Sequence, residues 1–413
     1  MMPHPILRAS LLPVEHWEYG LRDIAHVLHA APAIGGEPQR LYLDDIGPCI
    51  PTRSARCAIV LALQALGLPA GAHVGVPLYC CPIVFKAIRA AGMRARFIDV
   101  EPNGLCLAPD DLHAKRHDCD AVIAVHTFGQ VCDMQSIVSV GLPVIEDCAQ
   151  ALCSRTDGKP AGLLGDLAVF SFRSGKYLSV GEGGALHTRH ISLQEKLEAL
   201  TEALPASGLV EDGLHATMTL LRSALRSRPL WGLLGEWMWS VNSHLNEFAP
   251  HTPILMTQIY RSDLRIARER LGRLSEMVER QRAHARWHSR HLRDDLCAHA
   301  KEARGQWWNR YLYPLLFHRK DQRDVVAQFM HRRGIGTIKP YSDSPSIATR
   351  HFNYAGDCPH AESVAQRVLI PPSSHALGHT DLHRIARAFN DACSTAVLQT
   401  GIARPRSRAE ELE

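Results

Sequence analysis

The chain reads VIEDCAQAL at residues 144–152 and GLLGDLAVFSFRSGKYLSVGEGGA at residues 162–185. Each stretch contains a short apolar run, and we predict strands over residues 143–147 and 167–172. Glycines crowd the end of the second stretch, where they permit a tight backbone approach to another group. The two stretches therefore predict two strands that are followed by polar and Gly-rich segments.

Outward from these stretches, residues 52–189 alternate helical segments with short apolar runs, which is the pattern of a parallel sheet with crossover helices. Apolar residues at helical spacing predict helices over residues 55–66 and 82–91, which stop at Gly67 and Gly92. The predicted strands span residues 74–79, 95–100, 121–127, 143–147, 167–172 and 184–188. We therefore expect an α/β protein with a mostly parallel sheet in its large domain.

Polar side chains follow several of the predicted strands. They include His126, Asp147, Gln150, Ser171 and Lys176. In open parallel sheets, ligands bind outside the carboxyl ends of the strands. These side chains can therefore converge on one cleft although they are far apart in the sequence.

The second half of the chain has a different pattern. Residues 204–253 lose the strand pattern, and we interpret them as a helical insertion. Residues 258–286 predict one long charged helix. Its apolar stripe consists of Leu264, Leu271, Leu274 and Val278.

The C-terminal part resembles a small α+β unit. It contains a strand-like run at residues 311–317 and helical patterns at residues 323–333 and 380–392. We predict a large domain over residues 30–285, a small C-terminal α+β domain over residues 286–398, and a disordered tail over residues 399–413.

Composition limits the class of protein. A chain of 413 residues with 46% apolar and 21% charged residues can bury a large core. The net charge is only +4 and there is no basic stripe with interleaved aromatic residues, so we do not expect a nucleic-acid partner. Polar residues interrupt the apolar region at residues 229–245, which therefore falls short of a membrane span. We expect a soluble, cytoplasmic protein.

Twelve cysteines and 24 histidines prompt a search for a metal site. The cysteines lack the pair spacing of a zinc site, and we recognise no secretory signal, so we expect reduced thiols. His284 and His288 have a helical spacing that can place two imidazoles on one metal, but arginines surround them. We interpret this segment as an exposed charged helix and predict no metal site.

Lys176 and Asp147 suggest the chemistry of pyridoxal 5′-phosphate (PLP). That cofactor needs a lysine amine for a Schiff base, an acid that keeps its ring nitrogen protonated, and donors for its phosphate. Lys176 lies in a Gly- and Ser-containing turn, although a surface lysine is the alternative. Asp147 ends an apolar strand, where a buried carboxylate needs a cationic partner, and a helix N-cap is its alternative.

Donors for a phosphate are available where the first predicted helix begins. Ser54, Ala55 and Arg56 offer a hydroxyl, backbone amides and a guanidinium at a positive helix end, and Ser171 offers a second hydroxyl. Plain N-capping is an equally good interpretation of Ser54. A lone histidine at a strand end, such as His126, is often a hydrogen-bonded core residue.

The chain resembles the DegT/DnrJ/EryC1/StrS family of PLP-dependent sugar aminotransferases, which have fold-type I. The resemblance runs from about Leu41 to Asn390, with a gap through the insertion. It rests on IEDCAQA at residues 145–151, on GDLAVFSF at residues 165–172 followed by Lys176, and on GEGG at residues 181–184. The segments VHTFGQVCDM at residues 125–134 and RRGIGT at residues 332–337 are also similar to family segments.

The resemblance assigns expected roles to individual residues. These are a Schiff-base lysine and proton shuttle (Lys176), a partner of the ring nitrogen (Asp147), a contact on the ring-hydroxyl side (Gln150), a phosphate ligand (Ser171) and substrate contacts (His126 and Tyr79). The family implies transfer of an amino group from glutamate to a nucleotide-linked keto-sugar, in polysaccharide or secondary-metabolite biosynthesis. It also implies a homodimer with active sites at the subunit interface.

The sequence departs from the family pattern at three places. Ser54, Ala55 and Arg56 stand where members commonly have Ser-Gly-Thr. Residues 79–81, Tyr-Cys-Cys, stand where many members place an aromatic residue that stacks on the PLP ring. Residues 253–256 replace an Asn-Tyr-Arg segment that reaches the phosphate of the neighbouring subunit.

Two other functions remain open from the sequence. The first is a PLP enzyme that catalyses dehydration or another carbanion reaction on a non-sugar substrate. In a dehydratase branch of the family, histidine replaces the lysine, so Lys176 favours transamination. The second is a non-catalytic regulator, which has little physical need to keep both Lys176 and Asp147.

Overall fold

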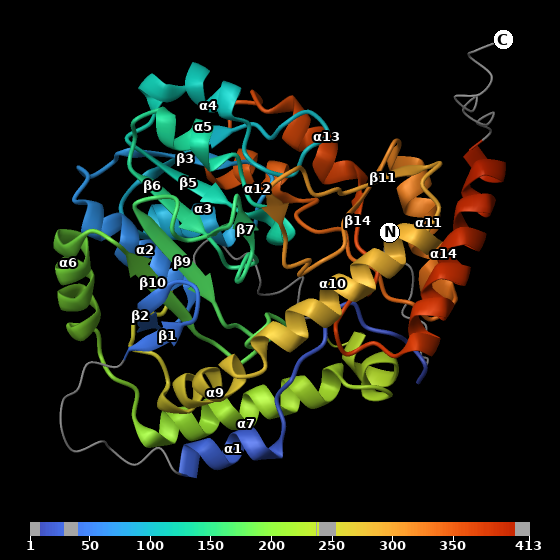
Figure 1. Ribbon diagram of the computed structural model, residues 1–413, viewed down its shortest axis with the longest axis horizontal. Coiled ribbons are helices and arrows are strands. Elements are labelled where there is room, and N and C mark those ends of the chain that lie inside the picture. The colour runs from blue at the N-terminus through green and yellow to red at the C-terminus, as the bar shows by residue number, and fades with distance from the viewer. Residues whose placement is uncertain (1–8, 29–39, 237, 239–252, 401–413) are drawn as a thin grey trace.

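The molecule is built around an eight-stranded sheet, seen in a computed structural model that describes residues 9–28, 40–236, 238 and 253–400 (Figure 1). The strand order is β1-β2-β10-β9-β6-β5-β3-β4. The strands are β1 (Leu41–Leu43), β2 (Gly47–Thr52), β3 (His73–Pro77), β4 (Arg94–Ile98), β5 (Ala121–Val125), β6 (Val144–Asp147), β9 (Leu167–Ser171) and β10 (Gly184–Thr188). Strands β3, β4, β5, β6 and β9 are parallel, and β10 runs antiparallel to β9 and β2. The prediction of an α/β fold with a mostly parallel sheet is confirmed.

Helices lie between successive strands of the sheet. They are α2 (Ala55–Leu66), α3 (Ile83–Ala90), α4 (Pro109–Ala114) and α5 (Met134–Ser139), with short 3-10 turns at Arg116–Asp118 and Thr127–Gly129. Helix α6 (Ile191–Glu202) follows β10, the last strand of the sheet in the chain. Local signals fix both ends of α2, because the Ser54 side chain caps its first turn and Gly67 ends it with a positive φ of 67°. The structure gives α2 the bounds predicted from the sequence.

The predicted long helix over residues 258–286 is wrong in one respect. The structure has two helices, α9 (Arg261–Leu271) and α10 (Leu274–His291), with Gly272 and Arg273 between them. Glycine is a poor helix former, and the Arg273 N–H bonds the Arg270 carbonyl, three residues back, which tightens the turn. The predicted apolar stripe still faces the core, since Leu264, Leu274 and Val278 are buried and Leu271 packs against them.

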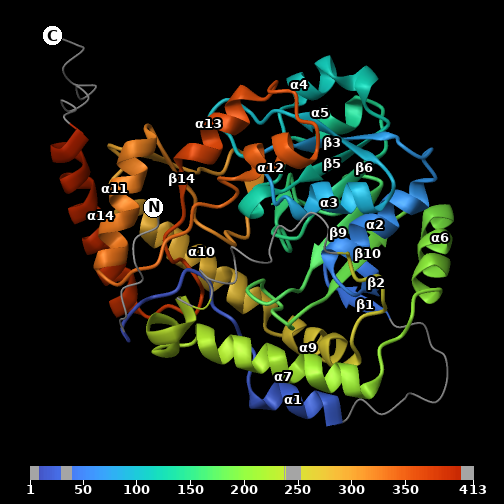
Figure 2. The same cartoon turned by 180° about the vertical axis from the view of Figure 1, so that it is seen from behind.

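The described part of the predicted insertion is helical. It contains α7 (Leu209–Arg226) and a short helix at Trp231–Gly235, whereas residues 237 and 239–252 lie outside the described residues. Helix α1 (Leu21–Leu28) lies beside α7 along one edge of the molecule, and α9 lies next to them (Figures 1 and 2).

The C-terminal part holds a second buried cluster. The C-terminal part contains the small sheet β11 (Cys297–His299), β13 (Leu315–Phe317) and β14 (Val368–Leu369), and the helices α11 (Lys320–Arg332), α12 (Ser344–His351), α13 (Pro359–Arg367) and α14 (His379–Thr400). A third small sheet consists of β7 (Arg155–Thr156), β8 (Lys159–Pro160) and β12 (Gln306–Trp307). Helices α11 and α14 and strand β13 share one cluster with Leu12, while the large sheet sits in the other. The predicted boundary after residue 285 falls inside α10, and the domain division stays a prediction.

The tail prediction needs a correction at its start. Gln399 and Thr400 belong to α14, because the helix continues past Ala392 to bury Cys393 and Ala396. Residues 401–413 lie outside the described residues.

The exposed setting predicted for His284 and His288 is wrong. Both imidazoles are buried, and they bond the carbonyls of Ser374 and Pro372 at 2.9 Å each.

All twelve cysteines lie in the described ranges and are free thiols. Among the described helices, none has the length and apolar character that a membrane span requires.

Candidate functional site

The candidate site lies at the carboxyl ends of β5, β6 and β9. Asp147 is the last residue of β6, and its carbonyl accepts a hydrogen bond of 3.1 Å from the His126 backbone N–H. The next N–H, from Cys148, donates to the Val169 carbonyl on β9. These bonds hold the three strand ends together, so the residues that follow them face one region.

Asp147 has the setting of a buried acid. Its side chain is buried, and one oxygen accepts a 2.9 Å hydrogen bond from the Ala149 N–H. Burial raises the pKa of Asp147, while the Ala149 N–H and the nearby Lys176 charge oppose that rise. A cation bound beside this carboxyl group would therefore gain an ion pair in a medium of low polarity.

Lys176 lies in the turn between β9 and β10, as predicted. Its backbone N–H donates to the Arg173 carbonyl, and its ammonium lies 4.4 Å from the centre of the Tyr311 ring. Burial lowers the pKa of Lys176 to about 8, against the opposing charges of Glu15 and Asp147. Because Lys176 and Asp147 each act on the pKa of the other, their charges interact within one site.

Gln150 links the sheet edge to the C-terminal part. Its side-chain oxygen accepts a 2.7 Å hydrogen bond from the Phe128 N–H, and its amide nitrogen donates to the Tyr341 hydroxyl at 2.5 Å. The rings of Phe128 and Tyr341 stack at 5.8 Å, and Tyr79 packs edge-on against both. Tyr79 is fully buried and donates to the Pro340 carbonyl. A contact between Tyr79 and the substrate stays a prediction.

Cys81 also belongs to this region. Burial raises the pKa of its thiol, and the charges of Arg173, Lys176 and Asp147 act on it. Cys81 belongs to the segment where an aromatic residue is expected to stack on the PLP ring. Its thiol is therefore close enough to Lys176 and Asp147 for their charges to change its pKa.

The predicted phosphate donors come together through β10. Gly184 pairs with Ser171 on one side and Thr52 on the other, and a Cβ added at Gly184 would lie 2.6 Å from the Ala55 nitrogen. Ser171 and the first turn of α2 therefore flank the same glycine. The Ser54 hydroxyl accepts a 3.3 Å bond from the Cys57 N–H, so the capping interpretation of Ser54 is realised.

Two arginines stand beside this helix end. Arg56 lies 3.6 Å from a Glu182 oxygen, and the buried Arg53 lies 3.0 Å from the other. The Arg53 guanidinium also sits 3.6 Å above the centre of the Tyr260 ring. The start of α2 therefore combines helix-end amides, which suit a phosphate, with two guanidinium groups that are already paired with the Glu182 carboxylate.

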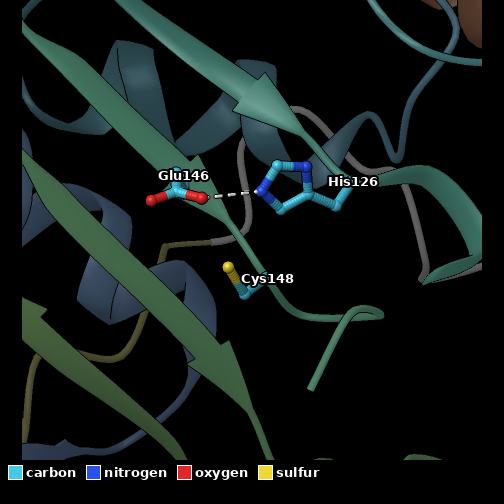
Figure 3. Close-up of side chains that lie close together, drawn as sticks. All are labelled: His126, Glu146 and Cys148. Atoms are coloured by element: carbon cyan, nitrogen blue, oxygen red, sulfur yellow. Dashed lines mark hydrogen bonds and ion pairs between the residues drawn. The ribbon is translucent and has the colours of Figure 1, made fainter. Parts of the chain in front are cut away.

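His126 lies in a buried network together with Glu146, and Cys148 lies close to both (Figure 3). Its Nε2 lies 3.0 Å from Glu146, and its Nδ1 accepts a bond from the Cys132 N–H. Its ligand atoms and those of Glu146 and Cys148 lie within 4.8 Å of one another, a spacing that a metal could use. Glu146, however, already accepts hydrogen bonds from three backbone N–H groups. The network is thus satisfied by protein groups, and a substrate contact by His126 stays a prediction.

Sequence reasoning missed several residues of this region. Arg53, Phe128, Tyr341 and Glu15 were not singled out. The position of Arg53 before a predicted helix start was a usable signal. The others gave none, because only the tertiary fold brings residues from such distant segments to the site.

The donor set fits PLP. Lys176 offers an amine whose lowered pKa leaves much of it neutral near pH 8, and Asp147 offers a buried acid for a ring nitrogen. Ser171 and the first turn of α2 offer hydrogen-bond donors for a phosphate. These groups match the aldehyde, the ring nitrogen and the phosphate of that cofactor.

Comparisons with known proteins agree with this geometry. A family model described as the DegT/DnrJ/EryC1/StrS aminotransferase family matches residues 42–219 and 259–390. The UDP-N-acetyl-3-dehydro-alpha-D-glucosamine 3-aminotransferase of Acidithiobacillus ferrooxidans is 27% identical over 403 residues, which cover 93% of this chain and 96% of that protein. The L-glutamine:2-deoxy-scyllo-inosose aminotransferase of Streptomyces fradiae is 34% identical over 224 residues, which cover 46% of this chain and 53% of that protein.

Four curated relatives, the Streptomyces fradiae protein among them, match over only part of their length. The chain spans 31% to 53% of the length of these four proteins. The fold matches solved structures more fully. The aminotransferase from Psychrobacter cryohalolentis superposes with a TM-score of 0.73 at 17% identity, covering 93% of this chain and all of that one.

Proposed function

Because the chain belongs to the DegT/DnrJ/EryC1/StrS aminotransferase family, we propose that it is a PLP-dependent enzyme that transfers an amino group from glutamate to a nucleotide-linked keto-sugar. Such a reaction serves polysaccharide or secondary-metabolite biosynthesis. The proposal rests on the buried amine and acid that interact at the carboxyl edge of the sheet. When bound, PLP supplies an electron sink that stabilises negative charge at the reacting carbon of the substrate.

Each residue of the site has a distinct task in this proposal. Lys176 holds the cofactor and moves a proton to or from the reacting carbon, and its lowered pKa makes more of the amine neutral than in an ordinary lysine. Asp147 keeps a proton on the ring nitrogen. Gln150, fixed by Phe128 and Tyr341, orients the ring, while Ser171 and the start of α2 bind the phosphate.

The cofactor and its lysine can be tested by absorbance. The purified protein should show the visible band of lysine-bound PLP, and Lys176→Ala should lose that band. Lys159→Ala, which changes an exposed lysine on β8, is the matched control and should keep it. A wild-type protein that stays colourless after incubation with PLP would contradict the proposal.

The substrate can be tested by half-reactions. Adding glutamate should convert the bound cofactor to its amine form, and a panel of keto-sugars with and without a nucleotide should be screened for the reverse change. The name of the Streptomyces fradiae relative specifies L-glutamine, so glutamine is compared with glutamate in the same assay. Conversion by glutamine alone would refute the proposed donor.

We also propose that the enzyme is a homodimer. The support is an exposed apolar face on α7, at a spacing of three to four residues, because such patches often mark protein contacts. It consists of Val210, Leu214, Met218 and Leu221. Light scattering should give the mass of a dimer, and Leu214→Asp should lower it, whereas a monomeric wild type would refute the idea.

A further inference from the structure

A carboxylate and a guanidinium meet at the edge of the Lys176 turn. One oxygen of Glu15 lies 3.1 Å from Arg226 Nη1, and the Trp17 indole N–H donates to the same oxygen at 3.4 Å. The Arg226 guanidinium packs over the rings of Trp17 and Trp231, at 4.4 and 5.0 Å from their centres. Its side chain is only 10% exposed. Arg226 is therefore held in a defined pose, with its Nη1 directed at a carboxylate.

This carboxylate lies next to the predicted reaction centre. A Cβ added at Gly175, the residue before Lys176, would be 3.0 Å from the same Glu15 oxygen. Val14, Glu15 and His16 line a small cavity together with Lys176 and Tyr311. After burial, the charge of Glu15 has the largest effect on the pKa of Lys176. The charge of Glu15 raises the pKa of the Tyr311 hydroxyl, and the charge of Arg226 lowers it. The ring of Tyr311 lies against the Lys176 ammonium.

Arg226 lies outside the family match. The family model breaks between residues 219 and 259, and Arg226 is the last residue of α7 inside that gap. Its partner Glu15 precedes the first matched residue, 42. The pair is therefore a property of this chain that the family match does not include.

We propose that Arg226 binds the α-carboxylate of the amino donor, and that Glu15 holds the guanidinium until the donor arrives. The proposal deepens the function proposed above and rests on it. The α-carboxylate of an amino acid is attached to the carbon that carries the reacting amine, so it must lie close to Lys176. The Glu15 carboxylate marks such a position, where one of its oxygens already accepts hydrogen bonds from Arg226 Nη1 and from the Trp17 indole N–H.

The two charged residues then have opposite effects on donor binding. Arg226 attracts the carboxylate of the donor, whereas Glu15 competes for the same guanidinium. Removing a group that occupies a binding position raises the apparent affinity of the ligand. A purely structural ion pair predicts instead that both substitutions disturb the site in the same direction.

The test measures binding without chemistry. Glutarate has both carboxylates of glutamate but no amine, so it binds the cofactor-loaded enzyme without reacting, and calorimetry gives its Kd. Arg226→Met should raise this Kd about tenfold to a hundredfold, and Arg226→Lys should raise it less. Glu15→Gln should lower it several-fold. Arg222→Met is the matched control, because this exposed arginine lies one turn earlier on α7, and it should change the Kd by less than about twofold.

The outcomes separate this proposal from the proposed function. If Glu15→Gln weakens glutarate binding, if Arg226→Met leaves the Kd unchanged, or if the unaltered enzyme does not bind glutarate, the carboxylate site is refuted even when transamination proceeds. If the Kd changes as expected but no keto-sugar is aminated, the carboxylate site stands and the sugar substrate is wrong. Circular dichroism of each variant checks that the fold is retained, and Glu15→Gln keeps the size of the side chain.

Discussion

Replacement of Glu146 is expected to cause a large loss of stability without touching the cofactor region directly. Its carboxylate is fully buried and faces the His126 imidazole (Figure 3). It accepts hydrogen bonds from the N–H groups of Gly162 at 2.9 Å and of Leu164 and Gly165 at 2.7 Å. It also lies 3.0 Å from His126. Glu146→Ala would therefore leave four donors unsatisfied in the interior.

The magnitude follows from the buried donors that lose their acceptor. Leaving one buried donor unsatisfied costs about 1–3 kcal/mol. Because Glu146→Ala affects four of them, we expect it to lower the free energy of unfolding by about 4 kcal/mol or more. Glu146→Gln should lose about half of that, since one amide oxygen can still accept N–H bonds while the amide NH₂ faces other donors.

The pH dependence gives a second expectation. Burial raises the pKa of Glu146, but the His126 bond and the backbone N–H groups outweigh it, so the folded-state pKa is lower than 4.5. The charge therefore stabilises the fold fully above pH 4.5, and this contribution is lost as the pH falls through the lower folded-state pKa. Glu146→Gln should remove that acid sensitivity.

Urea unfolding followed by circular dichroism measures both effects. Glu195→Ala changes an exposed glutamate on α6 and should alter stability by less than about 0.5 kcal/mol. A loss below about 1 kcal/mol in Glu146→Ala, or an unchanged acid transition in Glu146→Gln, would show that the network in the structure does not exist in solution.

Three further predictions concern the cofactor region. Asp147→Ala should fold and lose most turnover, because the ring nitrogen would not stay protonated, and full turnover would show that the residue is only a cap. Since burial lowers the pKa of Lys176 to about 8, cofactor-free protein should take up PLP at a rate that rises with pH and levels off above about 8; a rate still rising toward 10.5 would contradict this. Gly184→Ala should cost about 1–3 kcal/mol and weaken PLP binding, because its Cβ would meet the Ala55 backbone at 2.6 Å, as checked by unfolding and titration. Gly208→Ala is its control, since a Cβ there meets no described atom within 4 Å, and an equal loss in both would refute the packing argument.

The sheet and its first helices could be predicted because their signals are local. All six predicted strands of the large sheet have observed ends within two residues of the prediction. Strands covered on both faces read as continuous apolar runs, and α2 carries its own start at Ser54 and stop at Gly67. The order of polar residues along these strands then placed Asp147 and Lys176 in one site.

The errors arose where distant segments decide the structure. The arginines around His284 and His288 suggested an exposed helix, but the turn at residues 372–374 covers both imidazoles. The break at Gly272 is an exception, because the glycine is a local signal that lies inside a charge pattern which reads as continuous. The stack of Phe128 on Tyr341 joins residues that have no common local pattern. Such contacts depend on tertiary packing, which local periodicity does not encode.

The position of Leu12 constrains the order in which the chain can fold. Leu12 pairs with Ile335 and is fully buried in the same cluster as Ala396 on α14. On the ribosome, Leu12 emerges long before its partners on α11 and α14. All of the chain between them must therefore be synthesised before this cluster can close, and until then its apolar surface is available to chaperones or to other chains.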